Sequence, residues 1–259
     1  MRDPGEGLAP DGTIRTGADR SRIPVAFAPV IDDVIAAFDE VAGEDSSLLL
    51  YGSVATGAAR AGRSDVDLVA MGTAPEWCRS TARVLSARYS DLCRGVEIAP
   101  ASSPDTRRED DGMSDDEAYG ERVFLRHYCI TVAGVEVAGS WTPLPGDARA
   151  ARGFNGDIAR CLARWRAEPA PARSIARKTL LAAAGIVSIE DGTWTTDRGT
   201  AARRWCERRP EDAEACALLL QWVDDDREAT GVEVESVLAF DGFVDRVTQR
   251  FADTIGLWR

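Results

Sequence analysis

The sequence predicts a mixed α/β amino-terminal domain followed by an all-helical carboxy-terminal domain. Its 259 residues are enough for two modest domains. Strand-like and helix-like apolar patterns alternate up to about residue 145, and beyond it only helical spacing recurs. We therefore expect a fold of the α+β or α/β class, with a small mixed sheet in residues 23–145 and helices in residues 146–259.

Residues 1–22 are rich in Gly, Pro, Asp and Arg and contain few large apolar side chains. Such a composition is typical of a flexible tail, and we expect no chemistry there. From Pro29 the apolar residues follow helical spacing, and Gly43 is a plausible end for that helix.

Short apolar runs bounded by turn residues predict the strands of the first domain. The expected strands are residues 48–51, 65–71 and 95–101, with a helix over 75–89 and a hairpin-like segment over 128–139. The acidic stretch from Asp105 to Glu121 should form a mobile surface loop, because like charges repel one another. In the second domain, helical spacing predicts helices over 148–166, 172–188, 198–207, 212–223 and 232–255.

The composition limits the classes of protein to consider. Apolar residues make up 44% and charged residues 29%, which is ordinary for a soluble globular protein. No apolar run approaches the roughly 18 residues that a membrane span needs, and no signal sequence is recognisable, so we expect a cytoplasmic protein. The six cysteines lack a C-x-x-C pair and there is one histidine, which favours reduced thiols over a zinc site.

The formal net charge of −12 is informative about partners. It disfavours tight sequence-independent binding to nucleic acid, because phosphates are repelled. The same field favours a cationic small-molecule substrate.

Three carboxylates occur at strand positions that should share one polar face. Alternation along a strand turns Asp65 and Asp67 to the same side. Glu97, between the apolar Val96 and Ile98, should face that side from the next strand. Hard carboxylate oxygens suit Mg²⁺, which also takes the phosphates of a nucleotide as ligands.

Gly52 and Ser53 follow the first strand, where a short helix can begin. A glycine lets the backbone approach a phosphate closely, and a serine can cap the helix and donate its hydroxyl to a phosphate oxygen. The segment therefore combines a phosphate cradle with a metal-binding group.

The pattern G-S-x-x-x-G followed by S-D-x-D-L, which begins at Gly52, resembles the signature of DNA polymerase beta-type nucleotidyltransferases, particularly aminoglycoside adenylyltransferases. The resemblance implies that Gly52 and Ser53 bind the triphosphate, and we place Ser64 of the same signature with them. It also implies that Asp65 and Asp67 bind magnesium, with Glu97 as a third ligand or general base.

The segment 175–202 is similar to the helical domain of such enzymes, where a basic residue reaches the nucleotide phosphates. Arg177 and Lys178 are the matching candidates. The implied activity is magnesium-dependent transfer of AMP from ATP to a hydroxyl of a small, cationic, aminoglycoside-like acceptor. Adenylylation of a protein or RNA partner and an inactive nucleotide-binding regulatory module are the alternatives. The acceptor, the preferred base and the oligomeric state remain open.

Two further residues have expected roles. His127 lies between apolar residues, which favours a structural hydrogen bond over catalysis. Trp194 lies in a predicted turn and is a possible nucleotide or substrate contact.

Overall fold

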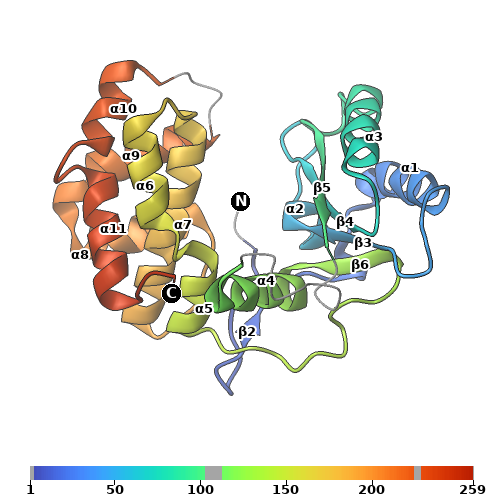
Figure 1. The fold of residues 1–259 in the computed structure, drawn as a ribbon, viewed down its shortest axis with the longest axis horizontal. Helices are drawn as coiled ribbons and strands as arrows, with labels where there is room; N and C mark the ends of the chain where they lie inside the picture. Colours follow the sequence, from blue (N-terminus) through green and yellow to red (C-terminus); the bar gives the residue numbers. More distant parts are fainter. Residues whose placement is uncertain (1–2, 103–112, 225–228, 259) are drawn as a thin grey trace.

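The structure is a computed structural model that describes residues 3–102, 113–224 and 229–258. Figure 1 shows two halves, a sheet flanked by helices and a bundle of helices, with α4 running between them. We call them the sheet half and the helical half. The predicted fold class, a small mixed sheet followed by helices, is confirmed.

The four strands of the main sheet have the order β5-β4-β3-β6. Their bounds are Ser47–Tyr51 for β3, Val66–Met71 for β4, Val96–Ala101 for β5 and Ile130–Gly134 for β6. β4 pairs in parallel with β5, whereas β3 is antiparallel to both β4 and β6. The expected hairpin over 128–139 is wrong, because α4 extends to Tyr128 and β6 pairs with β3 instead.

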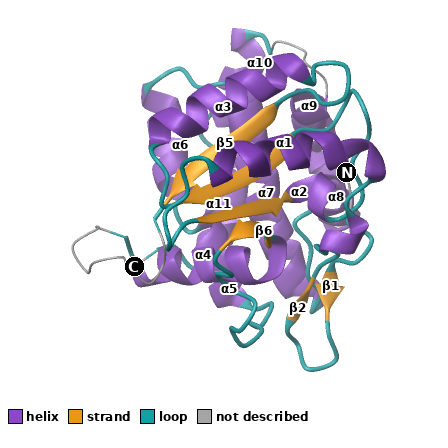
Figure 2. Ribbon diagram, turned by 90° about the vertical axis from the view of Figure 1, so that its right-hand side faces the viewer, coloured by secondary structure: helices purple, strands orange, loops and turns teal. Residues whose placement is uncertain are grey.

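One face of the sheet is covered by α1 (Ala28–Asp39) and α3 (Pro75–Arg88), as Figure 2 shows. Alternate strand residues such as Leu50 and Leu68 are fully buried against these helices. The opposite face is covered only in part. There Leu49 and Met71 pack with Leu125 of α4, Asp115–Tyr128, and leave the other end of the face to polar side chains.

The helical half is built around α7, Ala172–Asp191. The other elements of this half have the following bounds: α5 Ala148–Asn155, α6 Ile158–Ala167, α8 Arg198–Arg208, η5 Pro210–Asp212, α9 Ala213–Asp224, α10 Gly231–Leu238 and α11 Phe243–Thr254. Small buried residues of α7 let neighbouring helices approach closely; a Cβ on Gly185 would lie 3.2 Å from the Cβ of Ala151 in α5. No helix within the described residues is both long and apolar enough for a membrane span.

Two helices that we expected to be continuous are interrupted. Between α5 and α6, the indole of Trp258 packs on Gly156, and its Nε1 donates to the carbonyl of Arg152 at 2.7 Å. Between α10 and α11, Arg166 donates to the carbonyls of Leu238 and Ala239. In both places a side chain that is distant in sequence donates hydrogen bonds to carbonyl oxygens near a helix end. The local sequence pattern does not reveal such contacts.

The two halves meet where α4 crosses α5. A Cβ on Gly153 would lie 2.5 Å from the Cα of Gly120, so the two helix backbones are nearly in contact. Beside this crossing, Arg152 pairs with the largely buried Asp116 at 3.0 Å. The crossing therefore tolerates only glycine at its centre.

The expected mobile acidic loop is also corrected. Residues 105–112 lie outside the described residues, but Asp115 to Glu121 form the first half of α4. Ser114 caps this helix by accepting from the Glu117 amide at 3.2 Å. Acidic side chains in a first turn interact favourably with the helix dipole, so these charges stabilise a helix here.

The amino-terminal segment is folded rather than a flexible tail. Within residues 3–22, β1 (Gly7–Leu8) pairs with β2 (Ile14–Arg15), and η1 (Arg20–Arg22) follows. A second 3-10 turn, η2 (Val25–Phe27), leads into α1. The side chain of Ile14 is buried in the core of the helical half, which fixes a segment that is polar overall.

Candidate active site

The turn after β3 brings the backbone against a carboxylate. Gly52 begins α2, Gly52–Ala55, and has a φ of +73°, in the left-handed region that favours glycine. A Cβ at this position would also lie 2.6 Å from Oδ2 of Asp67. Glycine is therefore required twice, by the backbone conformation and by the approach of Asp67. Ser53 follows as the second residue of α2.

Three polar side chains lie in one register across the sheet. Tyr51 of β3 is opposite Asp67 of β4, and Asp67 is opposite Glu97 of β5. Neighbours at one register point to the same face. The structure therefore brings Asp67 and Glu97 together on the partly uncovered face, as the alternation predicted.

Asp65 precedes β4 and is held by an arginine. Nε of Arg94 donates to Oδ1 of Asp65 at 3.0 Å, and a second guanidinium nitrogen of Arg94 donates to Oδ2. This bidentate pairing fixes the orientation of the Asp65 carboxylate. Arg94 was not among our predicted site residues, although it lies only three residues before Glu97.

The electrostatics of this face are dominated by negative charge. Burial, followed by the nearby carboxylates of Asp65 and Glu97, raises the pKa of Asp67 from 3.8 to about 6, whereas Arg177 and Arg94 act in the opposite direction. Arg177 belongs to α7 in the helical half, so the carboxylate face is turned toward that half. Of the two predicted basic residues, Arg177 is the one whose charge acts on the site.

Tyr51 is the second polar residue that the sequence analysis missed. Burial, and then the charges of Asp67 and Glu97, hold the pKa of its phenol well above the usual value. The phenol therefore stays protonated and can donate a hydrogen bond beside the carboxylates. Its position at the end of an apolar strand, two residues after Leu49, was the available signal.

The donor chemistry fits a magnesium ion. Asp65, Asp67 and Glu97 offer hard oxygens. Burial and then repulsion by the other two carboxylates raise the pKa of Asp67, and a cation would relieve that repulsion. Among the described residues, however, no three metal-ligating side chains are gathered closely enough to hold an ion. The three carboxylates thus share a face without forming a compact metal cluster.

Two predicted nucleotide-binding residues have local structural partners. Ser64 is buried, and its hydroxyl accepts from the Arg60 amide at 2.9 Å. Nζ of Lys178 pairs with Asp157 at 2.5 Å and donates to the carbonyl of Phe154 at 3.1 Å. The structure brings neither side chain together with Asp67 and Glu97.

A row of aromatic rings leads away from the carboxylate face into the helical half. The ring centroids of Tyr51 and Phe124 are 5.0 Å apart, those of Phe124 and Tyr128 6.5 Å, and those of Tyr128 and Phe154 5.9 Å. Trp194 ends the row, 6.3 Å from Phe154. Because Trp194 is only 4% exposed, it is a core residue, and our expectation of a ligand contact at this residue is not supported.

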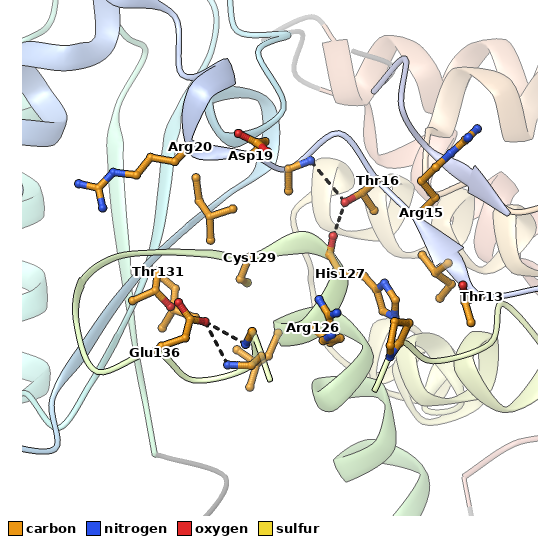
Figure 3. Close-up of a pocket in the computed structure, with 18 of the residues that line it drawn as sticks. Thr13, Arg15, Thr16, Asp19, Arg20, Arg126, His127, Cys129, Thr131 and Glu136 are labelled. Atoms are coloured by element: carbon orange, nitrogen blue, oxygen red, sulfur yellow. Dashed lines mark hydrogen bonds between the residues drawn. The ribbon is translucent and has the colours of Figure 1, made fainter. Parts of the chain in front are cut away.

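A cavity of about 560 Å³ lies apart from the carboxylate face, between the amino-terminal segment, the end of α4 and β6 (Figure 3). His127 lines it, and its Nε2 accepts from the Leu144 amide at 2.9 Å. Burial is the main cause that lowers the pKa of His127 to about 4, so the ring is neutral. This is the structural hydrogen bond expected for His127. None of Asp65, Asp67 and Glu97 lines this cavity.

Comparison with solved structures identifies a similar fold. The sequence matches no protein-family model and no curated protein. The chain is similar to spectinomycin adenyltransferase AAD(9) from Enterococcus faecialis, whose crystal structure was determined with ATP and spectinomycin. The TM-score is 0.54 and the sequence identity 12%, and the match covers 86% of this chain and 98% of that chain. The resemblance seen in the sequence is therefore confirmed at the level of the fold, which this chain shares with an adenyltransferase.

Proposed function

We propose that the chain is a nucleotidyltransferase that moves AMP from ATP to a hydroxyl group of a small acceptor. The observation that carries this proposal is the meeting of the Gly52 turn with the Asp67 and Glu97 register on one sheet face. Nucleotidyl transfer needs two parts: a backbone turn that binds phosphate and a pair of carboxylates that can hold a metal ion. The shared fold with an ATP-bound adenyltransferase supports it.

Each residue of the face has a role in this proposal. The backbone at Gly52 and the hydroxyl of Ser53 bind the triphosphate, and Arg177 reaches it from α7. The acceptor oxygen attacks the α-phosphorus, a new phosphoester bond forms, and the bond to the leaving pyrophosphate breaks. Glu97, the exposed member of the pair, accepts the proton of the acceptor hydroxyl.

Asp65 and Asp67, with Glu97 as a possible third ligand, are the residues that would hold magnesium. The ion would neutralise phosphate charge and acidify the acceptor hydroxyl. Arg94 orients Asp65, and the Gly52 backbone lies against the Asp67 carboxylate, so both side chains are positioned by neighbouring residues. Such positioning avoids the cost of ordering these side chains when the nucleotide binds.

The acceptor class that we propose is a cationic, aminoglycoside-like molecule. The net charge of −12 and the carboxylate excess around Asp67 support it, because both favour a multiply charged amine over an anion. Such attraction is screened within about 10 Å at 0.1 M salt. The KM for the acceptor should therefore rise with ionic strength.

The proposal is tested by incubating the protein with labelled ATP, Mg²⁺ and a panel of aminoglycosides. Pyrophosphate release and a labelled acceptor are expected, with Asp67→Asn as the inactive control. Loss of one metal-ligand charge should reduce the rate about a thousandfold or more. Equal turnover by Asp67→Asn would show that transfer does not depend on this face.

A further inference from the structure

The amino-terminal residues 3–22, which we call the strap, contact both halves of the molecule (Figure 1). In its middle, the Ile14 amide donates to the Leu144 carbonyl at 2.9 Å, and the Thr16 hydroxyl donates to the His127 carbonyl, as Figure 3 shows for Thr16. These bonds fix the strap to the end of α4 and to the segment that precedes α5. Its two ends reach opposite halves.

The first end of the strap is held by the carboxylate of Glu6. Oε1 accepts from the Thr196 amide at 2.8 Å, from the Thr196 hydroxyl at 2.5 Å and from the Tyr128 phenol at 3.1 Å. Oε2 accepts from the Thr195 hydroxyl at 3.0 Å. One carboxylate therefore joins three segments, namely the strap, the end of α4 and the turn between α7 and α8.

Tyr128 connects this carboxylate to the aromatic row. Its phenol oxygen accepts from Nε1 of Trp194 at 2.7 Å while it donates to Glu6. Burial, followed by the charge of Glu6, keeps the pKa of Tyr128 well above its usual value, so the phenol remains a donor. The Glu6 carboxylate thus fixes the hydrogen bonds of a ring that packs on Phe124, which in turn packs on Tyr51.

The other end of the strap lies on α2, the element that begins at Gly52. The Asp19 amide donates to the Ala55 carbonyl at 3.1 Å. A Cβ on Gly57 would lie 2.9 Å from the Arg22 carbonyl oxygen, so the strap backbone is in close contact with the end of the phosphate turn. The strap therefore links the α7–α8 turn to the proposed phosphate site.

We propose that Glu6 is a positioning residue for nucleotidyl transfer, which acts by holding the strap and α7 in fixed relation to the carboxylate face. This inference rests on the proposed function. Arg177 is on α7 and Asp67 on β4, so a nucleotide bound by both depends on how the halves are docked. Without Glu6, the α7–α8 turn and Tyr128 lose a common hydrogen-bond acceptor, and the helical half is then held less firmly against the sheet half.

The test compares Glu6→Ala and Glu6→Gln with Asp11→Ala as the matched control. Asp11 is an acid of the same strap, but among the described residues its carboxylate accepts only from Thr13 within the hairpin turn. Loss of Glu6 should raise the KM and the Kd for MgATP about tenfold, which corresponds to about 1.4 kcal/mol of binding energy. The kcat at saturation should change much less, and Asp11→Ala should resemble the wild type.

Amide hydrogen exchange supplies a readout that does not depend on turnover. Glu6→Ala should accelerate exchange at Thr196, which loses its direct acceptor, and also at Asp19, whose own acceptor on α2 is unchanged. Glu6→Gln keeps one acceptor oxygen and should therefore change exchange and nucleotide affinity less than Glu6→Ala. This milder variant keeps the proposal testable if Glu6→Ala fails to fold. A lower kcat with unchanged KM and Kd would indicate only a smaller folded fraction and would overturn the positioning role.

The two proposals fail in distinguishable ways. If the wild type transfers no nucleotide, the proposed function fails, whereas exchange and the Kd for MgATP still test the strap. If Asp67→Asn abolishes transfer but Glu6→Ala keeps wild-type KM, Kd and Asp19 exchange, the strap proposal alone is wrong. Faster exchange at Asp19 with unchanged nucleotide affinity would also overturn it, because the strap would then not position the site.

Discussion

Asp67→Asn should make the protein more stable while it abolishes transfer. Burial and neighbouring carboxylates raise the pKa of Asp67 from 3.8 to about 6, so above pH 6 the folded state contains a carboxylate charge in an unfavourable environment. Each pKa unit is worth about 1.4 kcal/mol, which gives an upper limit of about 3 kcal/mol at pH 7.5. Asn is uncharged and has nearly the same volume, so it removes this cost without a cavity.

The sign of the effect depends on pH. Because the folded pKa is the higher one, the ionised carboxylate destabilises the fold as pH rises through about 4 to 6, and the gain from Asn should disappear below pH 4. Calorimetric unfolding in metal-free buffer at pH 7.5 and 4.5 measures this difference. Asp65→Asn is the matched control. It breaks the ion pair with Arg94 and should lower the free energy of unfolding by up to about 1 kcal/mol, whereas Asp67→Asn should raise it. An Asp67→Asn variant that is less stable at pH 7.5, or equally stabilised at both pH values, would refute the reasoning.

Three further variants test the fold and the site. Gly120→Ala should lower the free energy of unfolding, measured by urea denaturation, by about 1–3 kcal/mol, because the new methyl group meets the backbone of Gly153. In the control Gly199→Ala, the added Cβ would lie 3.6 Å from its nearest neighbour, so the change should be neutral or stabilising. Because burial lowers the pKa of His127 from 6.5 to about 4, the unfolded chain binds a proton more readily, and stability should fall as pH drops from 6.5 to 4. His127→Gln should lack that part of the pH dependence in thermal unfolding, and identical pH profiles would contradict it. Glu97→Gln should reduce single-turnover transfer about a hundredfold or more with MgATP affinity retained if Glu97 is chiefly a base, and an unaffected rate would remove it from the site.

The carboxylate face could be predicted from the sequence because it depends on strand periodicity. Asp67 and Glu97 are flanked by apolar residues on both sides, so alternation alone turns them away from the core, and the observed register aligns them. Gly52 was predictable for a similar reason, since a glycine directly after an apolar run indicates a turn that other residues do not tolerate.

The remaining features depend on contacts between segments that are distant in sequence. Glu6 and Thr196 are 190 residues apart, and nothing in the polar strap indicates that one of its acids has buried donors. At the breaks near Gly156 and after Leu238, Trp258 and Arg166 donate to carbonyl oxygens, and no local helical pattern contains these two side chains. Local periodicity therefore predicts which face is polar, but it does not predict which distant side chains fix its orientation.

The central claim is that the face formed by Gly52, Asp65, Asp67 and Glu97 binds the metal and the nucleotide. It is tested most directly by a crystal structure with Mn²⁺ and a non-hydrolysable ATP analogue, in which anomalous scattering locates the metal. We expect the anomalous peak beside Asp65 and Asp67, with the phosphates at the Gly52 turn and Arg177 directed toward them. A nucleotide bound elsewhere, for example in the cavity beside His127, with no metal peak at Asp67, would contradict the account.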